Sequence, residues 1–481
     1  MLNRLKLAAL AITTCLVVAT SLGAQPADST SWMRVDSVLA EEMRATQTPG
    51  AVVVAIRGDS VVYLKARGVA SVETGAPVTP ETMFRVASVT KMFTGLTASL
   101  LAERAVVDLS APIGLYAGDL APGLRALTLR GLLSHTAGLR DAFAVPGAGG
   151  AATLRAPAQQ LDVHALLTDP GTVYSYSNIG FMLAGYVLES ASGVPFAELV
   201  DREVLAPLGM KHSTLLLTMA MTHPLALGHE ADAADPSRAI VMRPFTDKAE
   251  LLPRAGLYST APDMARFASA LMNATTPTAT HSLSRAAIAR TMEVHASAPA
   301  DPPGGVPEQQ YGLGMRITQY RGHREVGHLG GGVGYGAVVR LLPDQRKGVV
   351  VLANLDSALL NRTADAVLDA LLSDDVSPAM TTAAIDAPVP LSDAEARALV
   401  GRYRNAADET LIFSMQSGEL VLEDETPLRV QRVGPSTLAV LAPDGAIALR
   451  MVIVPGSADC IAFLFAFGRA FQHEGACAES H

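Results

Sequence analysis

One apolar segment, Val86 to Ala102, constrains the fold of this chain more than any other part of its sequence. Its apolar side chains recur at the three- and four-residue spacing of a helix with a buried face. The only charged residue in the segment is Lys91. Burying an ammonium group is costly unless it is paired or loses its proton. The sequence therefore predicts a buried helix beginning near Ser88, inside a core that the 49% hydrophobic content can supply.

Ser88 and Lys91 stand three residues apart, so on a helix their Cβ atoms lie roughly 5–6 Å from each other. A serine hydroxyl is a poor nucleophile without a base. A lysine can be that base if desolvation lowers its pKa from about 10.4 toward neutrality. Such pairs also arise by chance, so the spacing alone is a weak signal, and the apolar surroundings strengthen it.

Two further segments carry groups that suit acyl transfer. Tyr176 could relay a proton, and Asn178 could orient the lysine or a substrate carbonyl. The alternative for this segment is a turn with a packed aromatic ring. Farther along, Gly327-His328-Leu329-Gly330-Gly331 precedes an apolar strand, and its glycines would let the backbone approach a substrate and donate an N–H to an oxyanion. For His328 the alternative is a structural hydrogen bond.

The three elements occur in order, at separations of about 90 and 150 residues. In this arrangement the chain resembles the serine β-lactamase and penicillin-binding protein superfamily, in its class C β-lactamase-like branch. The resemblance covers residues 30 to 375. It is strengthened by three segments that match the family's patterns: Val78 to Ser88, Leu132 to Leu139 (Leu-Leu-Ser-His-Thr-Ala-Gly-Leu), and Ala255 to Thr260 with Asp263 and Phe267.

The resemblance implies a role for each matching residue. Ser88 would be acylated, Lys91 and Tyr176 would share the general-base work, and Asn178 would support them. The oxyanion hole would be formed by the backbone N–H groups of Ser88 and Gly331, with His328 and Gly330 beside the substrate. For His135 we favour a structural hydrogen bond. No cofactor is implied.

The third motif departs from that of class C β-lactamases, which carry Lys-Thr-Gly where this chain has His328-Leu329-Gly330. Histidine is mostly neutral at pH 7, so capture of a substrate carboxylate should be weaker. Histidine at this place is similar to esterase, D-aminopeptidase and transpeptidase-like members. We therefore expect a serine hydrolase acting on an ester, amide or peptide. The alternatives are a β-lactamase or D,D-carboxypeptidase, and a binding module that keeps the fold without turnover.

The first 24 residues have the layout of a secretory signal peptide: a basic start with Arg4 and Lys6, an apolar run, and small residues at Gly23 and Ala24. A membrane anchor is the alternative, but the run is shorter than the roughly 20 residues that span a bilayer. We therefore expect a periplasmic or secreted protein with no membrane span after cleavage. Cleavage would remove two positive charges and no negative ones, so the formal net charge would move from −9 to −11, which argues against nucleic acid as the main partner and says nothing about the substrate. The partner expected from the resemblance is a small-molecule or peptide substrate.

The mature chain would keep two cysteines, Cys460 and Cys477. In an exported protein they are candidates for a disulfide, with two free thiols as the alternative. Two cysteines without a flanking metal motif predict no metal site.

The expected fold is α/β: an antiparallel sheet flanked by helices, with a helical subdomain between the first and third motifs. We place the signal peptide at 1–24, the hydrolase domain at 25–376 and a linker at 377–390. Strands are predicted at 51–56, 61–64 and 66–72, and the loops at 140–160 and 213–250 should shape the substrate pocket. Short apolar runs between turn residues predict a small all-β domain over 391–481, which resembles the lipocalin-like tail of some family members.

Overall fold

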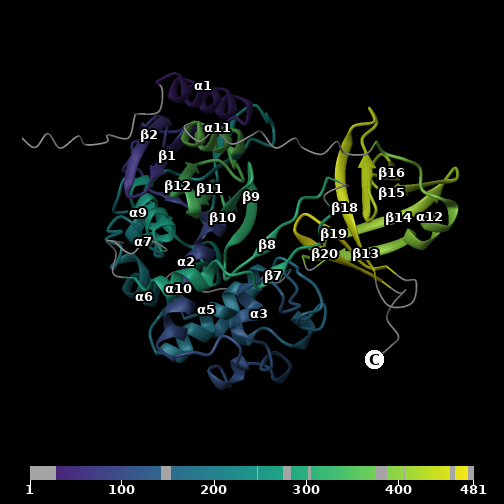
Figure 1. Cartoon of the computed structure of the whole chain (residues 1–481), viewed down its shortest axis with the longest axis horizontal. Coiled ribbons are helices and arrows are strands. Elements are labelled where there is room, and N and C mark those ends of the chain that lie inside the picture. The colour runs from purple at the N-terminus through teal and green to yellow at the C-terminus, as the bar shows by residue number, and fades with distance from the viewer. Residues whose placement is uncertain are drawn as a thin grey trace, which may run out of the picture.

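The computed structural model describes residues 29–141, 153–245, 247–274, 283–301, 305–373, 387–405, 407–455 and 461–474. Two units are visible in Figure 1: an α/β unit, and a C-terminal β-barrel drawn in yellow and green at its side. The predicted signal peptide, most of the predicted linker, and both Cys460 and Cys477 lie outside the described residues.

In the described part of the chain, eight strands form one antiparallel sheet in the order β2-β1-β12-β11-β10-β9-β8-β7. The strands are β1 Gly50–Arg57, β2 Ser60–Gly68, β7 Ala296–Ser297, β8 Gln310–Tyr311, β9 Arg316–Tyr320, β10 His323–Gly332, β11 Tyr335–Leu342 and β12 Lys347–Ala353. The central strands β1 and β12 are buried along almost their whole length, which explains their continuous apolar sequences.

Helices cover both faces of this sheet. Helices α1 (Ser29–Ala45) and α11 (Asn361–Leu372) pack on one face, against side chains such as Val53. Helices α2 (Thr90–Glu103) and α9 (Ala261–Met272) lie in the core on the other face, which takes the alternate side chains such as Val52. The predicted antiparallel sheet flanked by helices is confirmed.

The predicted buried helix is α2, preceded by a 3₁₀ turn at Ala87–Val89. It is buried from Thr90 to Leu101, far more completely than one apolar face requires, because α5, α8 and α10 pack against it. The separate third strand predicted at 66–72 is wrong. The backbone instead stays in one long strand, β2, up to Gly68, because its pairing with β1 continues that far.

Beyond α2 the chain forms a mainly helical region that packs beneath the sheet (Figure 1). Its main elements are α3 Leu129–Leu133, α4 Arg155–Gln159, α5 Asn178–Ser192, α6 Phe196–Val200, a π-helical turn Asp201–Leu205, α7 Leu217–Ala220, α8 Leu252–Ala255 and α10 Arg285–Thr291. Two short ribbons pair β3 (Phe84–Arg85) with β6 (Tyr258–Ser259), and β4 (His229–Ala231) with β5 (Ala239–Val241).

Among the described residues no single helix is long and apolar enough to cross a bilayer. One pair of helical segments, α5 and Phe196–Leu205, is long and apolar enough when taken together, but the pair is bent by 82°.

The C-terminal domain is a closed antiparallel barrel that begins after helix α12 (Asp393–Leu399). Its strands are β13 Gly401–Asn405, β14 Thr410–Gln416, β15 Glu419–Leu422, β16 Leu428–Arg432, β17 Thr437–Leu441, β18 Ile447–Pro455, β19 Ile461–Ala466 and β20 Arg469–His473. Alternate side chains such as Phe413, Leu438 and Phe471 form its own core with Leu399 of α12. The predicted all-β domain is confirmed.

Candidate active site

Ser88 lies in a tight turn between β3 and α2. Ala87 has a φ of +44°, which is strained for a residue with a Cβ, and the turn is fixed by neighbours. The Thr90 hydroxyl donates to the Ala87 carbonyl at 2.7 Å, and the Val86 N–H donates to the Leu257 carbonyl at 2.9 Å. Ser88 is partly exposed while its neighbours are buried, so its hydroxyl is the accessible group of this turn.

Lys91 is completely buried, and its Nζ reaches three oxygen atoms from three elements. It lies 3.1 Å from the Ser88 hydroxyl, 2.8 Å from Oδ1 of Asn178 and 3.0 Å from the Arg254 carbonyl. Burial holds the pKa of Lys91 well below its usual value, and the nearby Arg254 guanidinium lowers it further. The amine is therefore poised to lose its proton to solvent and to accept the one from Ser88.

Tyr176 and Asn178 reach the site from the start of α5. Ser177 caps this helix by accepting a hydrogen bond from the Gly180 N–H at 3.1 Å, which fixes the residues on either side. The hydroxyls of Tyr176 and Ser88 hydrogen-bond to each other, and Nζ of Lys91 lies 4.9 Å from the centre of the Tyr176 ring. Burial raises the pKa of Tyr176, so its phenol keeps its proton.

Asp141 is a site residue that the sequence analysis missed. Its carboxylate accepts hydrogen bonds from the backbone N–H of Asn178 at 2.5 Å and from the Asn178 carboxamide at 2.9 Å. It also accepts from the Ile179 N–H, so it stabilises the N-terminus of α5 with a negative charge. One signal was available: Asp141 follows the family-like segment Leu132 to Leu139 after a single residue.

Gly330 and Gly331 lie on β10, which passes directly beside the nucleophile. A Cβ on Gly330 would stand 2.3 Å from the Val86 carbonyl oxygen and 3.2 Å from the Ser88 nitrogen, so only glycine allows this approach. Strand β9 pairs with β10 only as far as Gly327. Within the described residues, the remaining edge of β10 therefore has no neighbouring strand on this side, and it can offer a backbone N–H to a substrate.

The two histidines near the site are buried and neutral. Nδ1 of His328 donates to the Leu329 carbonyl at 2.6 Å, and its Nε2 accepts from the Tyr311 hydroxyl at 2.8 Å. His135 accepts a hydrogen bond from the Ser177 N–H on Nδ1 at 3.0 Å, while its Nε2 has no hydrogen-bond partner among the described residues. Burial, followed by the nearby Lys91, lowers the pKa of each imidazole well below its usual value.

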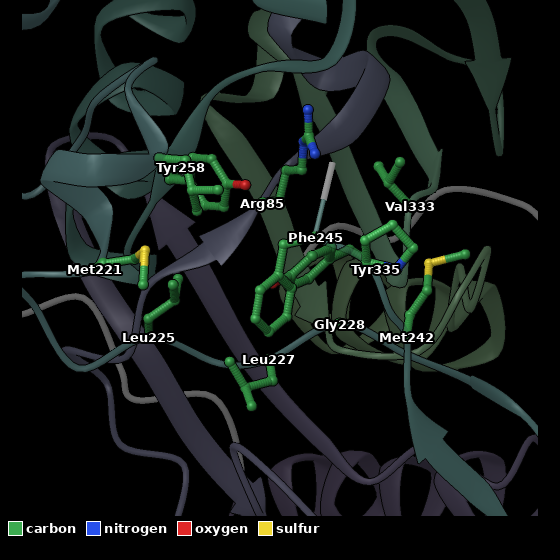
Figure 2. A pocket seen from close by; sticks show the side chains of 12 residues that line it. Arg85, Met221, Leu225, Leu227, Gly228, Met242, Phe245, Tyr258, Val333 and Tyr335 are labelled. Atoms are coloured by element: carbon green, nitrogen blue, oxygen red, sulfur yellow. The ribbon is translucent and has the colours of Figure 1, made fainter. Parts of the chain in front are cut away.

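An apolar cavity is lined by Arg85, which lies three residues before Ser88, and by residues of several other segments (Figure 2). The space in it where the centre of a water-sized group fits is about 40 Å³. Most of its wall is apolar or aromatic: Leu217, Met221, Leu225, Leu227, Met242, Pro244, Phe245, Tyr258, Val333 and Tyr335, with Arg85 and Gly228. Met221 and Phe245, which line it, are 62% and 49% exposed.

The described residues contain no group of three or more His, Cys, Asp or Glu side chains that could hold a metal ion. The fold brings together Ser88, Lys91, Tyr176 and Asn178, the four catalytic candidates that the sequence analysis named. A partly exposed serine with a buried, deprotonatable lysine against its hydroxyl is the arrangement of a serine hydrolase that forms acyl-enzymes.

Comparison with known proteins agrees with this class. The Beta-lactamase family matches residues 35–373, well over half of the chain, so the protein belongs to the β-lactamase family of serine hydrolases.

Similar proteins include hydrolases of several kinds. The unguisins hydrolase ungD of Aspergillus violaceofuscus is 29% identical over 65% of this chain and 59% of its own length. The esterase EstB of Burkholderia gladioli is 31% identical over 37% of this chain and 50% of its own. The chain thus spans less than two thirds of these curated relatives. The crystal structure of SurE superimposes with a TM-score of 0.74 at 26% identity, covering 93% of this chain and all of SurE.

Proposed function

We propose that this protein is an exported serine hydrolase that transfers the acyl group of an ester, amide or peptide to Ser88 and then to water. The hydrogen bonds of Lys91 are the observation that carries the catalytic part. Export is inferred from the layout of residues 1–24. The amino-terminal residue of the mature protein tests it, and we expect Gln25.

A neutral amine has two N–H bonds and one lone pair. Two of the three oxygens around Lys91, Oδ1 of Asn178 and the Arg254 carbonyl, can only accept hydrogen bonds. They therefore engage both N–H bonds of the neutral amine. The lone pair is left facing the third oxygen, the Ser88 hydroxyl at 3.1 Å, in the direction needed to take its proton.

The reaction follows from this geometry. Oγ of Ser88 attacks the substrate carbonyl carbon while its proton passes to Lys91, and the backbone N–H groups of Ser88 and Gly331 stabilise the oxyanion. When the bond to the leaving group breaks, that group takes a proton through the Tyr176 hydroxyl, which touches Ser88. Water, deprotonated by the same groups, then attacks the acyl-enzyme, and Ser88 recovers its proton.

The apolar cavity supports an apolar acyl group as the substrate's recognised part. Two segments connect it to the reacting centre: the turn from Arg85 to Ser88, and the end of β10 from Gly331 to the residue that follows the strand, Val333. Each spans two or three residues, so the cavity begins within roughly 10 Å of the Ser88 hydroxyl. A substrate carbonyl bound between Ser88 and Gly331 can thus direct its acyl chain into the cavity.

The neutral state of His328 favours ester and amide substrates over substrates that are recognised through a carboxylate. Both of its ring nitrogens are engaged within the protein, and its lowered pKa leaves it neutral at pH 7. It therefore lacks the permanent positive charge that holds the carboxylate of a β-lactam.

The direct test is to compare p-nitrophenyl butyrate with nitrocefin. We expect the purified protein to hydrolyse the ester with a kcat/KM at least about 100-fold above that for nitrocefin, because the missing cation weakens only the binding of the carboxylate. Equal or faster nitrocefin hydrolysis would favour the β-lactamase alternative. Turnover of neither substrate, with no adduct on Ser88, would favour a binding module.

The cavity predicts a preference for longer acyl chains. Each buried methylene contributes about 0.8 kcal/mol, so p-nitrophenyl butyrate should exceed the acetate in kcat/KM by roughly tenfold. Phe245→Asp places a charge at the exposed rim and should reduce this ratio at least about threefold without changing acetate hydrolysis. Leu115→Asp, which alters a 72% exposed side chain outside the cavity, is the control. An unchanged ratio in Phe245→Asp would show that the acyl chain binds elsewhere.

A further inference from the structure

The C-terminal barrel contacts the α/β unit at the active site. Side chains of β18 and β19, Val452 and Phe465, pack with Tyr174 and Tyr311 in one buried cluster. Phe463 and Ala470 pack with Val173 in a second. In Figure 1 these strands lie beside β7 and β8 at the edge of the sheet. Val173 and Tyr174 belong to the segment that leads into Tyr176, so the barrel buries the backbone that carries the catalytic tyrosine.

The turn between β19 and β20 contacts the segment that carries Tyr176 directly. Phe467 and Gly468 both have positive φ, +53° and +75°, which is the geometry of a tight two-residue hairpin turn. The Gly468 carbonyl accepts a hydrogen bond from the Tyr176 N–H at 3.0 Å. The Ala470 N–H donates to the Ser175 hydroxyl at 3.3 Å. The tip of the barrel is therefore fixed to the backbone of the catalytic segment.

Arg469 follows this turn and enters the site. Its Nη2 donates to Oδ2 of Asp141 at 2.7 Å, and its guanidinium lies 5.8 Å from the centre of the Tyr176 ring. The Arg469 side chain is 20% exposed and that of Asp141 only 4%. A carboxylate so deeply buried needs a charged partner, and the barrel supplies it.

Asp141 determines which way the Asn178 carboxamide faces. A carboxylate can only accept hydrogen bonds, so the Asn178 NH₂ group must turn toward Asp141, and Oδ1 must turn toward Lys91. The opposite orientation would aim an N–H at the lone pair that Lys91 needs for the Ser88 proton. A fixed Asp141 therefore keeps the base free to act.

We propose that the C-terminal barrel is a working part of the active site, in which Arg469 is a positioning residue that acts through Asp141 and Asn178 on Lys91. This inference rests on the proposed hydrolase function. It assigns to the barrel a role that the hydrolase fold by itself does not explain.

The charges around Lys91 predict a change in its pKa as well as a loss of rate. The charged groups that face Lys91 are Asp141, which raises its pKa, and Arg254 and Arg469, which lower it. His135, His328 and Tyr176 also face it, and all three are neutral. Removing Arg469 leaves Asp141 uncompensated, so the pKa of Lys91 should rise. Removing the Asp141 charge should lower that pKa.

The test is the pH profile of kcat/KM for p-nitrophenyl butyrate in full-length variants. Because the active form needs a neutral Lys91, activity is lost as pH falls through its pKa. Arg469→Ala should lower kcat/KM roughly tenfold at neutral pH and move the acid limb to higher pH. Asp141→Asn should move the limb to lower pH. Arg469→Lys, which keeps the charge, should recover part of the rate, and Arg469→Ala should add little to Asp141→Asn.

Arg432→Ala is the matched control, because Arg432 is a barrel arginine with a carboxylate partner, Glu395, at 2.8 Å and 24% exposure. It should leave the profile unchanged. Thermal unfolding checks that each variant is folded. Wild-type turnover with the same acid limb in Arg469→Ala, or with both limbs moving in the same direction, would overturn this inference alone. No wild-type turnover would overturn the proposed function and this inference with it.

Discussion

Replacing Ser88 with alanine is expected to lower kcat/KM for p-nitrophenyl butyrate by about 10⁴-fold or more. The variant loses the only hydroxyl that both Lys91 and Tyr176 contact among the described residues, so no acyl-enzyme can form there. The turn itself should persist, because its hydrogen bonds run through Val86, Ala87 and Thr90. Initial rates and circular dichroism of the purified variant measure both effects.

The matched control is Ser99→Ala, which removes a buried hydroxyl from α2 without touching the site. Ser99 donates to the Ala287 carbonyl at 2.7 Å, so its loss should cost about 1 kcal/mol of stability and no activity. Ester hydrolysis that survives Ser88→Ala at more than a few per cent would mean that another residue is the nucleophile.

The second large effect is expected for Lys91→Met, which should reduce kcat/KM roughly 10³-fold, within the range that a positioned general base contributes. Methionine fills a similar volume and has no lone pair basic enough to take the Ser88 proton. The wild-type profile should lose activity as pH falls through the pKa of Lys91, which burial holds well below its usual value. The variant should lack that acid limb. A pH–rate profile from about pH 5 to about pH 10, which begins below the histidine reference pKa of about 6.5 and ends near that of lysine at about 10.4, records both.

Lys347→Met provides the comparison, because Lys347 is also buried, at 7% exposure. It is the first residue of β12, and the last residue of that strand, Ala353, pairs with Gly336 at the opposite end of the β11–β12 ladder. Its replacement should leave the profile of ester hydrolysis unchanged. Wild-type activity that appears only near the ordinary lysine pKa would contradict the assignment of Lys91 as a neutral base.

The parts of the fold that follow from local pattern could be predicted. The apolar spacing around Lys91 predicted the buried helix, and the short apolar runs between turn residues after residue 390 predicted an all-β domain. The catalytic candidates were found because each lies in a segment with a recognisable order: Ser88 with Lys91, then Tyr176 with Asn178. The sequence could not reveal how completely α2 is buried, since that depends on contacts with α5, α8 and α10.

Local sequence pattern does not connect Asp141 and Arg469 with the site, although Asp141 lies just after a family-like segment. Asp141 lies 37 residues before Asn178, in a loop, and its contact depends on how that loop folds over the start of α5. Arg469 is 328 residues from Asp141 and belongs to another domain. No periodicity or motif connects such distant positions, because the placement of one domain on another is decided by the packing of Val173 and Tyr174 against the barrel.

The apolar cavity shows a similar limit. The segment 213–250 was expected to shape the pocket, and it supplies much of the wall, including Met221, Met242 and Phe245. Its chemistry became clear only when the fold added Tyr258 from β6 and Tyr335 from β11. Together these side chains make a mostly apolar wall beside a polar reacting centre.

The most direct test of whether Ser88 is the nucleophile is to identify the residue that carries the acyl group. Wild-type protein is mixed with p-nitrophenyl butyrate, quenched with acid within the first turnover, digested, and analysed by mass spectrometry. We expect one butyryl group, located on Ser88, and none in Ser88→Ala. A butyryl group on another residue, or rapid ester hydrolysis without any adduct at the earliest times, would contradict this expectation.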